Sequence, residues 1–172
     1  MSSTAIRTRI SLVAAAAVVV SLGFSASPAN AAVGSMKAEL CVGGCQGQSH
    51  PYGTALVGIR GLVPMARTEA QDLIDRGHKV VFRMWGDDPL SDDLLYGPRG
   101  ISIWASEEGL KFNYLSWRVN SAFDEDDSRF DEHDELYAGV RLVTSVSYDA
   151  QHRLTHGATV RSAETNRVGG YF

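Results

Sequence analysis

The residues from Asp124 to Glu135 are the part of the sequence with the clearest chemical character. This run of twelve residues, DEDDSRFDEHDE, holds eight acidic side chains and a single basic one, Arg129. A second, shorter run, GDDPLSDDLLYG (Gly86–Gly97), holds four aspartates. Carboxylates this close together repel one another unless water or a cation compensates their charge. Calcium is the cation we expect, because it takes roughly six to eight oxygen ligands in a flexible geometry.

Negative charge is concentrated in these two acidic runs rather than spread over the chain. The 172 residues include 20 acidic and 16 basic side chains, a formal net charge of −4, and twelve of the acids lie in the two runs. No basic stripe is visible that could bind phosphates, so the sequence argues against nucleic acid as a partner. The alternative to an ion site is a pair of solvated loops, whose Asp and Ser residues favour turns and whose charge prevents pairing between strand edges.

Both acidic runs resemble the calcium-binding loop of the conserved-region-two lipid-binding domains first described in protein kinase C. Those domains are β-sandwiches in which an Asp-x-Asp, a spacer and a further Asp follow a strand. In this chain Asp124-Glu125-Asp126 is similar to the Asp-x-Asp, and Asp134 to the later Asp. The resemblance implies a β-sandwich with a Ca²⁺ site whose ligands are Asp88, Asp92, Asp93, Asp124, Asp126 and Asp134.

The sequence favours a binding module over an enzyme. A pair of carboxylates could hydrolyse a glycoside, but these acids lie in exposed polar runs rather than in apolar pockets that would separate their pKa values. The five histidines form no H-E-x-x-H pattern, and G-x-S-x-G is absent from the sequence. The first alternative is a secreted protein–protein interaction domain, similar to an inhibitor or a toxin, with solvated acidic loops. A carboxylate-based hydrolase is less favoured. The expected partner is an unidentified protein or a glycan, with Trp85, Trp104 and Trp117 as candidate contact residues.

Residues 1–31 have the pattern of a secretory signal peptide. A basic leader precedes the apolar stretch Ile10–Phe24, and Ala29-Asn30-Ala31 fits an A-x-A cleavage site. The apolar stretch is shorter than the roughly 20 residues that a membrane-spanning helix needs. We therefore predict a cleaved leader, no transmembrane segment and an extracellular location. Residues 32–172 would then form a single β-rich domain, which we expect to be monomeric.

The two cysteines, Cys41 and Cys45, are separated by Val42-Gly43-Gly44. The glycines permit a tight turn that brings the sulfur atoms together, and export would place them in an oxidising compartment. A small-loop disulfide is therefore the favoured prediction, with a free or metal-bound pair as the alternative. A zinc site would need two more ligands, and only His50 is nearby.

One helix and several short strands must position the acidic runs. Thr68 and Gln71 fit a capping box, and Gly77 fits the glycine that follows a helix, so we predict a short helix between them. Many alternating segments joined by turns indicate a mainly β fold, an antiparallel β-sandwich or partly open barrel with one short α-helix. Both acidic runs should then lie at the mouth of the fold. The predicted strands are residues 54–63, 79–85, 100–105, 110–119 and 136–148, with a returning strand over 153–161 after a turn at 149–152.

Overall fold

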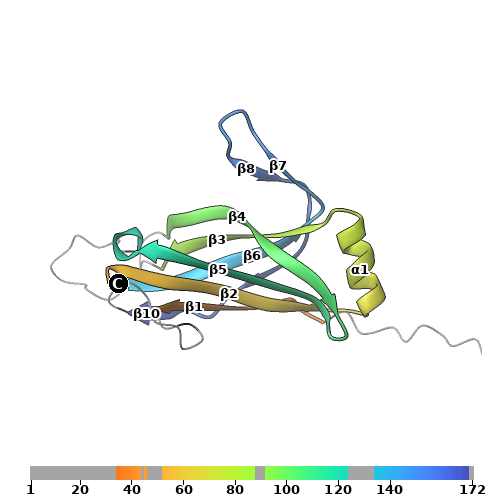
Figure 1. Cartoon of the computed structure of the whole chain (residues 1–172), viewed down its shortest axis with the longest axis horizontal. Helices are drawn as coiled ribbons and strands as arrows, with labels where there is room; N and C mark the ends of the chain where they lie inside the picture. The colour runs from red at the N-terminus through yellow and green to blue at the C-terminus, as the bar shows by residue number, and fades with distance from the viewer. Residues whose placement is uncertain (1–33, 44, 46–51, 88–91, 124–133, 171–172) are drawn as a thin grey trace, which may run out of the picture.

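The computed structural model describes residues 34–170, except residue 44 and residues 46–51, 88–91 and 124–133. The predicted signal peptide lies outside the described residues. The described chain is mainly β, an antiparallel and nearly closed barrel of seven strands with one short α-helix, which confirms the predicted fold class (Figure 1). No helix within these ranges has the length and apolar character needed to cross a bilayer.

Ten strands, one α-helix and one 3-10 turn make up the described chain. In chain order they are β1 (Lys37–Gly43), β2 (Thr54–Pro64), α1 (Arg67–Asp75), β3 (Lys79–Gly86), β4 (Asp93–Ser106), β5 (Gly109–Val119), η2 (Asn120–Ala122), β6 (Asp134–Val143), β7 (Val146–Tyr148), β8 (Leu154–His156), β9 (Thr159–Glu164) and β10 (Val168–Gly170).

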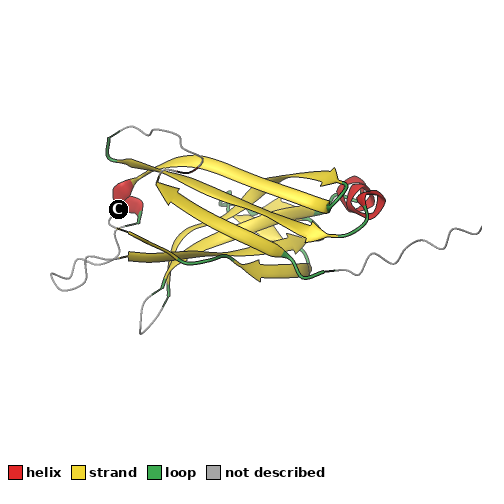
Figure 2. Cartoon of the chain, turned by 90° about the horizontal axis from the view of Figure 1, so that it is seen from below, coloured by secondary structure: helices red, strands yellow, loops and turns green. Residues whose placement is uncertain are grey.

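Antiparallel pairing carries the sheet around the barrel in the order β1-β2-β5-β4-β3-β6-β10, and Figure 2 shows the strands enclosing a common interior. Strand β9 pairs with β6 as well, further along the same edge. β9 and β10 are therefore successive halves of one irregular seventh strand.

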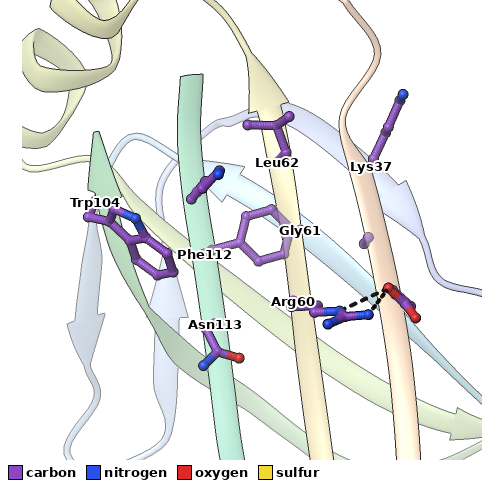
Figure 3. A pocket seen from close by; sticks show the side chains of 10 residues that line it. Lys37, Arg60, Gly61, Leu62, Trp104, Phe112 and Asn113 are labelled. Carbon is purple, nitrogen blue, oxygen red and sulfur yellow. Dashed lines mark hydrogen bonds and ion pairs between the residues drawn. The ribbon is translucent and has the colours of Figure 1, made fainter. Parts of the chain in front are cut away.

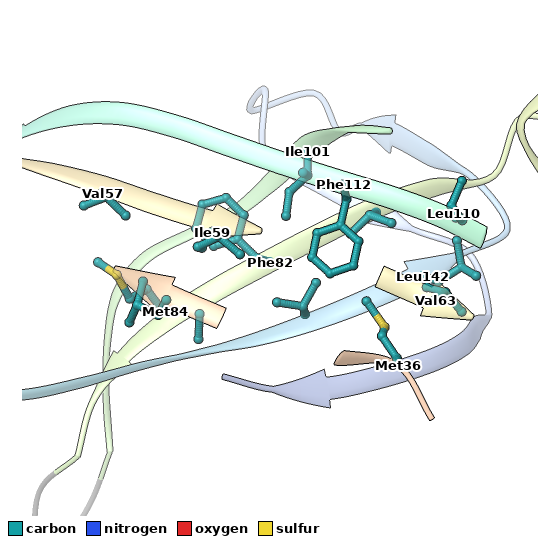
Figure 4. Close-up of a cluster of buried hydrophobic side chains, with 14 of the residues drawn as sticks. Met36, Val57, Ile59, Val63, Phe82, Met84, Ile101, Leu110, Phe112 and Leu142 are labelled. Atoms are coloured by element: carbon teal, nitrogen blue, oxygen red, sulfur yellow. The ribbon is translucent and has the colours of Figure 1, made fainter. Parts of the chain in front are cut away.

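The barrel interior is filled by side chains, because every second residue of each strand faces inward. Val57, Ile59 and Val63 of β2 are buried, as are Phe82 of β3 and Phe112 of β5 (Figure 4). Burying a side chain of this size contributes about 1.5–3 kcal/mol. These strands form here because each presents one apolar face to a shared core and one polar face to solvent.

Gly61 is required by the size of the residue opposite it. Phe112 pairs with Gly61 across the β2–β5 ladder, and its ring occupies the space that a side chain at residue 61 would need. A Cβ atom on Gly61 would lie 2.2 Å from Cζ of Phe112 and 2.1 Å from the carbonyl oxygen of Lys37. Only glycine lets the aromatic ring cover this stretch of backbone.

Strand β4 forms a corner between two parts of the barrel. The second half of β4, from Ser102, pairs with β5, whereas the first half pairs with β3. A bulge interrupts the pairing with β3 near Gly97, whose φ is 105°. Bulges bend a strand and increase its twist. The tyrosines Tyr96 and Tyr114 bridge β4 and β5 where their backbones no longer pair, with the two hydroxyl oxygens 2.9 Å apart.

One side chain joins the first strand of the barrel to the last. Between β9 and β10 the chain bulges, so that Tyr137 of β6 faces both Asn166 and Arg167. The bulge directs Asn166 toward β1, where the Leu40 amide donates to Oδ1 of Asn166 at 2.9 Å and Nδ2 of Asn166 donates to the Leu40 carbonyl at 3.1 Å. The Asn166 side-chain amide therefore makes the two backbone hydrogen bonds that a neighbouring strand would make. We call this gap between β1 and the last strand of the barrel the seam.

Helix α1 lies at one end of the barrel, beside the turn between β4 and β5 (Figure 1). Ala70 and Leu73 are buried against the sheet, as their spacing predicts. The predicted capping box at Thr68 and Gln71 is wrong. The helix begins at Arg67 with Ala66 at the N-cap and no side-chain cap. Thr68 therefore lies inside the helix, and the Gln71 side chain donates to Oδ1 of Asp75 at 2.8 Å.

The end of α1 agrees with the prediction. Gly77 has a φ of 84°, the left-handed conformation that glycine adopts most easily. The Gly77 amide donates to the Ile74 carbonyl at 2.9 Å, and the His78 amide donates to the Leu73 carbonyl at 3.0 Å. These two bonds form a Schellman motif.

Two predicted strands are each divided in the structure. The predicted strand over 136–148 consists of β6 and β7, separated at Thr144 and Ser145, and the predicted strand over 153–161 consists of β8 and β9. The reason is that β7 and β8 leave the barrel and pair with each other as a projecting hairpin (Figure 1). Its turn is at the predicted position, where Oδ1 of Asp149 accepts from the amides of Gln151 (2.9 Å) and Arg153 (2.8 Å).

Other strand boundaries also differ from prediction. β4 begins at Asp93 rather than at Gly100, because pairing with β3 extends the strand back through Tyr96 and Leu94 to the acidic run. The second half of the predicted loop Gly86–Gly97 is therefore strand. β1 and β10 were not predicted, because β1 ends in the cysteine and glycine residues that were assigned to a tight turn, and two of the three residues of β10 are glycine.

The predicted disulfide between Cys41 and Cys45 is present, with the two Cα atoms 5.6 Å apart. It lies on the outer face of the sheet at the end of β1. The Cys45 sulfur, which carries no hydrogen in a disulfide, makes a 3.2 Å contact with the Leu56 carbonyl oxygen. The bridge therefore holds the chain that follows β1 against β2.

Replacing Asn166 by alanine should loosen the seam of the barrel. Two hydrogen bonds to the Leu40 backbone disappear, and a part-buried amide and carbonyl lose their partner, which should cost about 1–3 kcal/mol. Native-state hydrogen exchange should show faster exchange at the Leu40 amide. Asn113→Ala, on the outer face of β5, is the control and should leave that amide protected; equal protection in all three proteins would contradict this role of Asn166.

Candidate functional site

The two acidic runs leave the barrel side by side. β3 enters the first run and β6 leaves the second, and these strands pair from Lys79↔Val143 to Gly86↔Leu136. The ladder continues one step further, because the Asp87 amide donates to the Glu135 carbonyl at 2.7 Å. The stems of both acidic runs are thus bonded to each other, at the end of the barrel opposite α1 (Figure 1).

The predicted calcium ligands are only partly within the described chain. Asp92 and Asp93 are exposed at the start of β4, and Asp134 opens β6, where its backbone pairs with Gly170. Among the described residues no group of three or more His, Cys, Asp or Glu side chains is arranged to hold a metal ion. The calcium site stays a prediction. The remaining predicted ligands, Asp88, Asp124 and Asp126, lie outside the described residues.

Two carboxylates at the base of the acidic runs have specific partners. The hydroxyl of Tyr137 donates to Oδ2 of Asp92 at 2.6 Å, and Nε of Arg167 donates to Oδ2 of Asp87. The hydrogen bond to Asp92, followed by burial and the charge of Asp92, raises the pKa of Tyr137 to about 12. The Tyr137 hydroxyl therefore keeps its proton at neutral pH and remains a donor.

Aromatic and cationic groups stack beneath these contacts. The rings of Trp85 and Tyr137, which face each other across the β3–β6 ladder, are nearly parallel at 19° with centroids 5.5 Å apart. The Arg167 guanidinium lies 5.0 Å from the centroid of Tyr137. Its hydrogen bond and charge interaction with Asp87 raise the pKa of Arg167. We call Trp85, Tyr137 and Arg167 the stem stack.

Gly139 leaves space for the indole of the stem stack because it has no side chain. A Cβ atom at residue 139 would lie 2.8 Å from Cζ3 of Trp85, so the indole rests directly over this glycine. The bulge at Asn166 and Arg167 sends one side chain to the seam and the other over Tyr137. Closure of the barrel and support of the acidic runs therefore depend on the same irregularity in one strand.

Arg118 makes a separate set of contacts with aromatic side chains inside the barrel, near the end that carries the acidic runs. The Arg118 guanidinium lies 3.8 Å from the centroid of Tyr96, and Nη2 of Arg118 donates to the Tyr114 hydroxyl at 3.0 Å. Burial lowers the pKa of Arg118. Within the described chain, Nε of Arg118 and Oδ1 of Asn120 are buried without a hydrogen-bond partner.

A groove on the outer face of the barrel is the second candidate site (Figure 3). It has a volume of about 560 Å³, within the range of small-molecule sites. The sheet register builds it from two neighbouring cross-strand rows. One row is Lys37, Leu62, Lys111 and Trp104, and the next is Glu39, Arg60 and Asn113.

The groove combines an apolar surface with a cationic rim. Trp104 is 45% exposed, and Leu62, which also lines the groove, lies in the same cross-strand row on the other side of Lys111. Arg60 is paired with Glu39 at 2.9 Å and Lys111 with Glu108 at 2.8 Å, whereas Lys37 has no ion-pair partner in the part of the chain that the structure describes. We call this site the Trp104 groove.

Sequence reasoning missed both the stem stack and the Trp104 groove. Trp104 was a candidate contact residue, but its neighbours come from four strands whose register the sequence does not reveal. Arg167 gave no signal at all, because it lies in a bulge just before β10, a strand that the sequence did not predict. The one available signal was the strand pattern around Tyr137, which places an aromatic residue on the outer face.

Comparison with protein-family models, with curated proteins and with solved structures finds no match for this chain. The resemblance to conserved-region-two domains therefore depends on the residues of the acidic runs alone.

Replacing Tyr137 by phenylalanine should remove a pH-dependent part of the stability. The pKa of Tyr137 is raised from 10.0 in the unfolded chain to about 12 in the folded one. The associated stability is therefore complete below pH 10 and is lost as the pH rises through 12, a total of about 1–2 kcal/mol because solvent screens the exposed Asp92 carboxylate. Chemical unfolding at pH 8, 10 and 12 should show a wild-type advantage that shrinks across this window.

The matched control for Tyr137 is Tyr148→Phe, on the projecting hairpin, where the side chain is 66% exposed. This variant should follow the wild type at every pH, because general titration of lysines affects both proteins equally. A constant difference between Tyr137→Phe and wild type from pH 8 to pH 12 would show that the hydrogen bond to Asp92 does not hold the proton.

Proposed function

We propose that this chain is an exported, non-catalytic binding module that calcium stabilises at the end carrying the two acidic runs. The observation that carries the proposal is the hydrogen bond from the Asp87 amide to the Glu135 carbonyl, 2.7 Å long. It fixes the stems of two carboxylate-rich segments next to each other. Twelve of the 20 acidic residues of the chain belong to the two runs whose stems meet there.

Electrostatics supports a cation at this end. Each pair of carboxylates about 4 Å apart costs about 1 kcal/mol in water and more where solvent is partly excluded. In the described chain Arg167 neutralises Asp87, and Tyr137 donates to Asp92 without adding charge. These two contacts leave most of the negative charge of the acidic runs to be compensated, and a divalent cation with oxygen ligands does this most effectively.

The stem stack supports the same proposal through preorganisation. Trp85 and Tyr137 are held by strand pairing and by each other, and Arg167 ties Asp87 to the bulge. Segments that start from rigid stems lose less entropy when they become ordered around an ion. Calcium affinities of about 10⁻⁴–10⁻³ M, typical of extracellular modules, would be sufficient for an exported protein. We propose a protein or a glycan as the partner at this end.

Calcium should raise the melting temperature of the protein. An ion that binds only the folded state stabilises it by about 2.7 kcal/mol at a hundredfold excess over Kd. For a domain of this size that corresponds to about 5–10 °C. Thermal unfolding in chelator, in calcium, in magnesium and in sodium chloride of matched ionic strength separates a specific ion from charge screening, which sodium would reproduce.

Variants identify where the ion binds. Asp126→Asn and Asp134→Asn should abolish the calcium-specific shift, whereas Glu69→Gln, on exposed α1 at the opposite end of the barrel, should retain it. Equal melting temperatures of the wild type in chelator and in several millimolar calcium would end the calcium proposal.

A further inference from the structure

We propose that the Trp104 groove binds a small amphipathic organic anion, with the acidic head at Lys37 and the apolar body across Leu62 and Trp104. This site is independent of the acidic runs and of calcium. The groove lies near α1, where β1 and β5 begin and β2 and β4 end, whereas the acidic runs leave the other end.

The positive charge of the Trp104 groove favours an anionic ligand. Lys37, Arg60 and Lys111 line the groove, and Glu39 and Glu108 compensate Arg60 and Lys111, which leaves one positive charge, that of Lys37, at this site. The chain as a whole carries −4, so this face is opposite in sign to the rest of the molecule. Arg60 and Lys111 already have carboxylate partners. Lys37 is the one groove cation without such a partner among the described residues, so it is the residue that should receive the head group.

The apolar part of the ligand follows from the same cross-strand row. Leu62 lies between Lys37 and Lys111, and Trp104 ends the row on β4. Because Lys111 is held by Glu108, its aliphatic stem can lie along the groove while its charge stays at the rim. A ligand therefore meets a cation at one end of the row and an indole at the other.

Strand spacing sets the length of the ligand. Lys37 and Trp104 are three inter-strand steps apart, which is about 14 Å along the sheet. A carboxylate with an unbranched chain of about ten carbons spans this distance, whereas a four-carbon acid does not. The groove volume of about 560 Å³ accommodates a molecule of this size.

The experiment uses matched ten-carbon amphiphiles, all kept below the concentration at which they form micelles. Decanoate, decanol and decyltrimethylammonium differ in head-group charge, and butyrate is the short acid. The readout is the set of three tryptophan indole N–H signals in NMR spectra of ¹⁵N-labelled protein. Decanoate should shift the Trp104 signal and leave those of Trp85 and Trp117 in place, and butyrate should bind at least about tenfold more weakly because it cannot bury the same apolar area.

Charge variants test the head-group position. Lys37→Gln should weaken decanoate binding about twofold to fivefold, as expected for loss of one exposed charge interaction. Lys37→Glu should reverse the preference, so that decyltrimethylammonium binds more tightly than decanoate. Lys79→Gln, at the start of β3 away from the groove, is the control and should bind decanoate like the wild type.

Several results would overturn the proposal. Equal affinity for decanoate, decanol and decyltrimethylammonium would show adsorption to an apolar surface without a head-group site. Binding to vesicles that contain 30% anionic lipid by a protein that does not bind monomeric decanoate would reveal a membrane-binding face instead of a site for a single organic anion. Decanoate binding should be the same in calcium and in chelator, so failure of this proposal and failure of the calcium proposal are separate outcomes.

Discussion

The ladder between β3 and β6 is the interaction on which the rest of the molecule depends. It places Val80, Phe82 and Met84 inside the barrel opposite Leu142, Val140 and Ala138, and all of these side chains are buried. It also connects the five strands that precede the long acidic run to those that follow it. Because its partners are far apart in the sequence, the ladder must close a long loop before it gains any burial energy. The outward side of the same ladder then provides Trp85 and Tyr137.

The molecule separates its charges along the barrel. The described acidic residues at the stems of the two runs lie at one end of the barrel, and Lys37, a groove cation with no ion-pair partner among the described residues, lies near the other end. From Leu62 to Thr54 along β2 the two regions are about 26 Å apart, well beyond the screening length of about 8 Å at physiological salt. Occupation of one region therefore has little direct electrostatic effect on the other. Such a charge distribution also orients charged molecules as they approach.

Patterns that depend on neighbours in the sequence were predictable, and patterns that depend on register were not. Alternation in β2, β3 and β5 identified these strands closely, and Gly77 identified the end of the helix, because each signal is local. The acidic start of β4 looked like loop, since only its pairing with β3 makes it a strand.

The candidate sites show the same difference between features that neighbouring residues determine and features that strand register determines. Acidic residues at the mouth of the fold could be named from composition, but the partners of Asp87 and Asp92 could not. Arg167 reaches Asp87 from 80 residues away through a bulge that has no sequence signature. The Trp104 groove needs four strands in register before its rows exist. Local chemistry is legible in a sequence, whereas a surface assembled from distant strands becomes visible only when the sheet is known.

The projecting hairpin of β7 and β8 has a consequence for how this protein could change over time. The hairpin contributes no buried strand to the barrel ladder, and its turn is held by bonds of its own around Asp149. Exposed tips of this kind are the places where chains accept added residues without loss of the fold. New sequence inserted near Gln151 would extend outward from the body of the protein. The tip of this hairpin is therefore a site at which evolution could add residues to the protein, or at which a reporter sequence could be inserted.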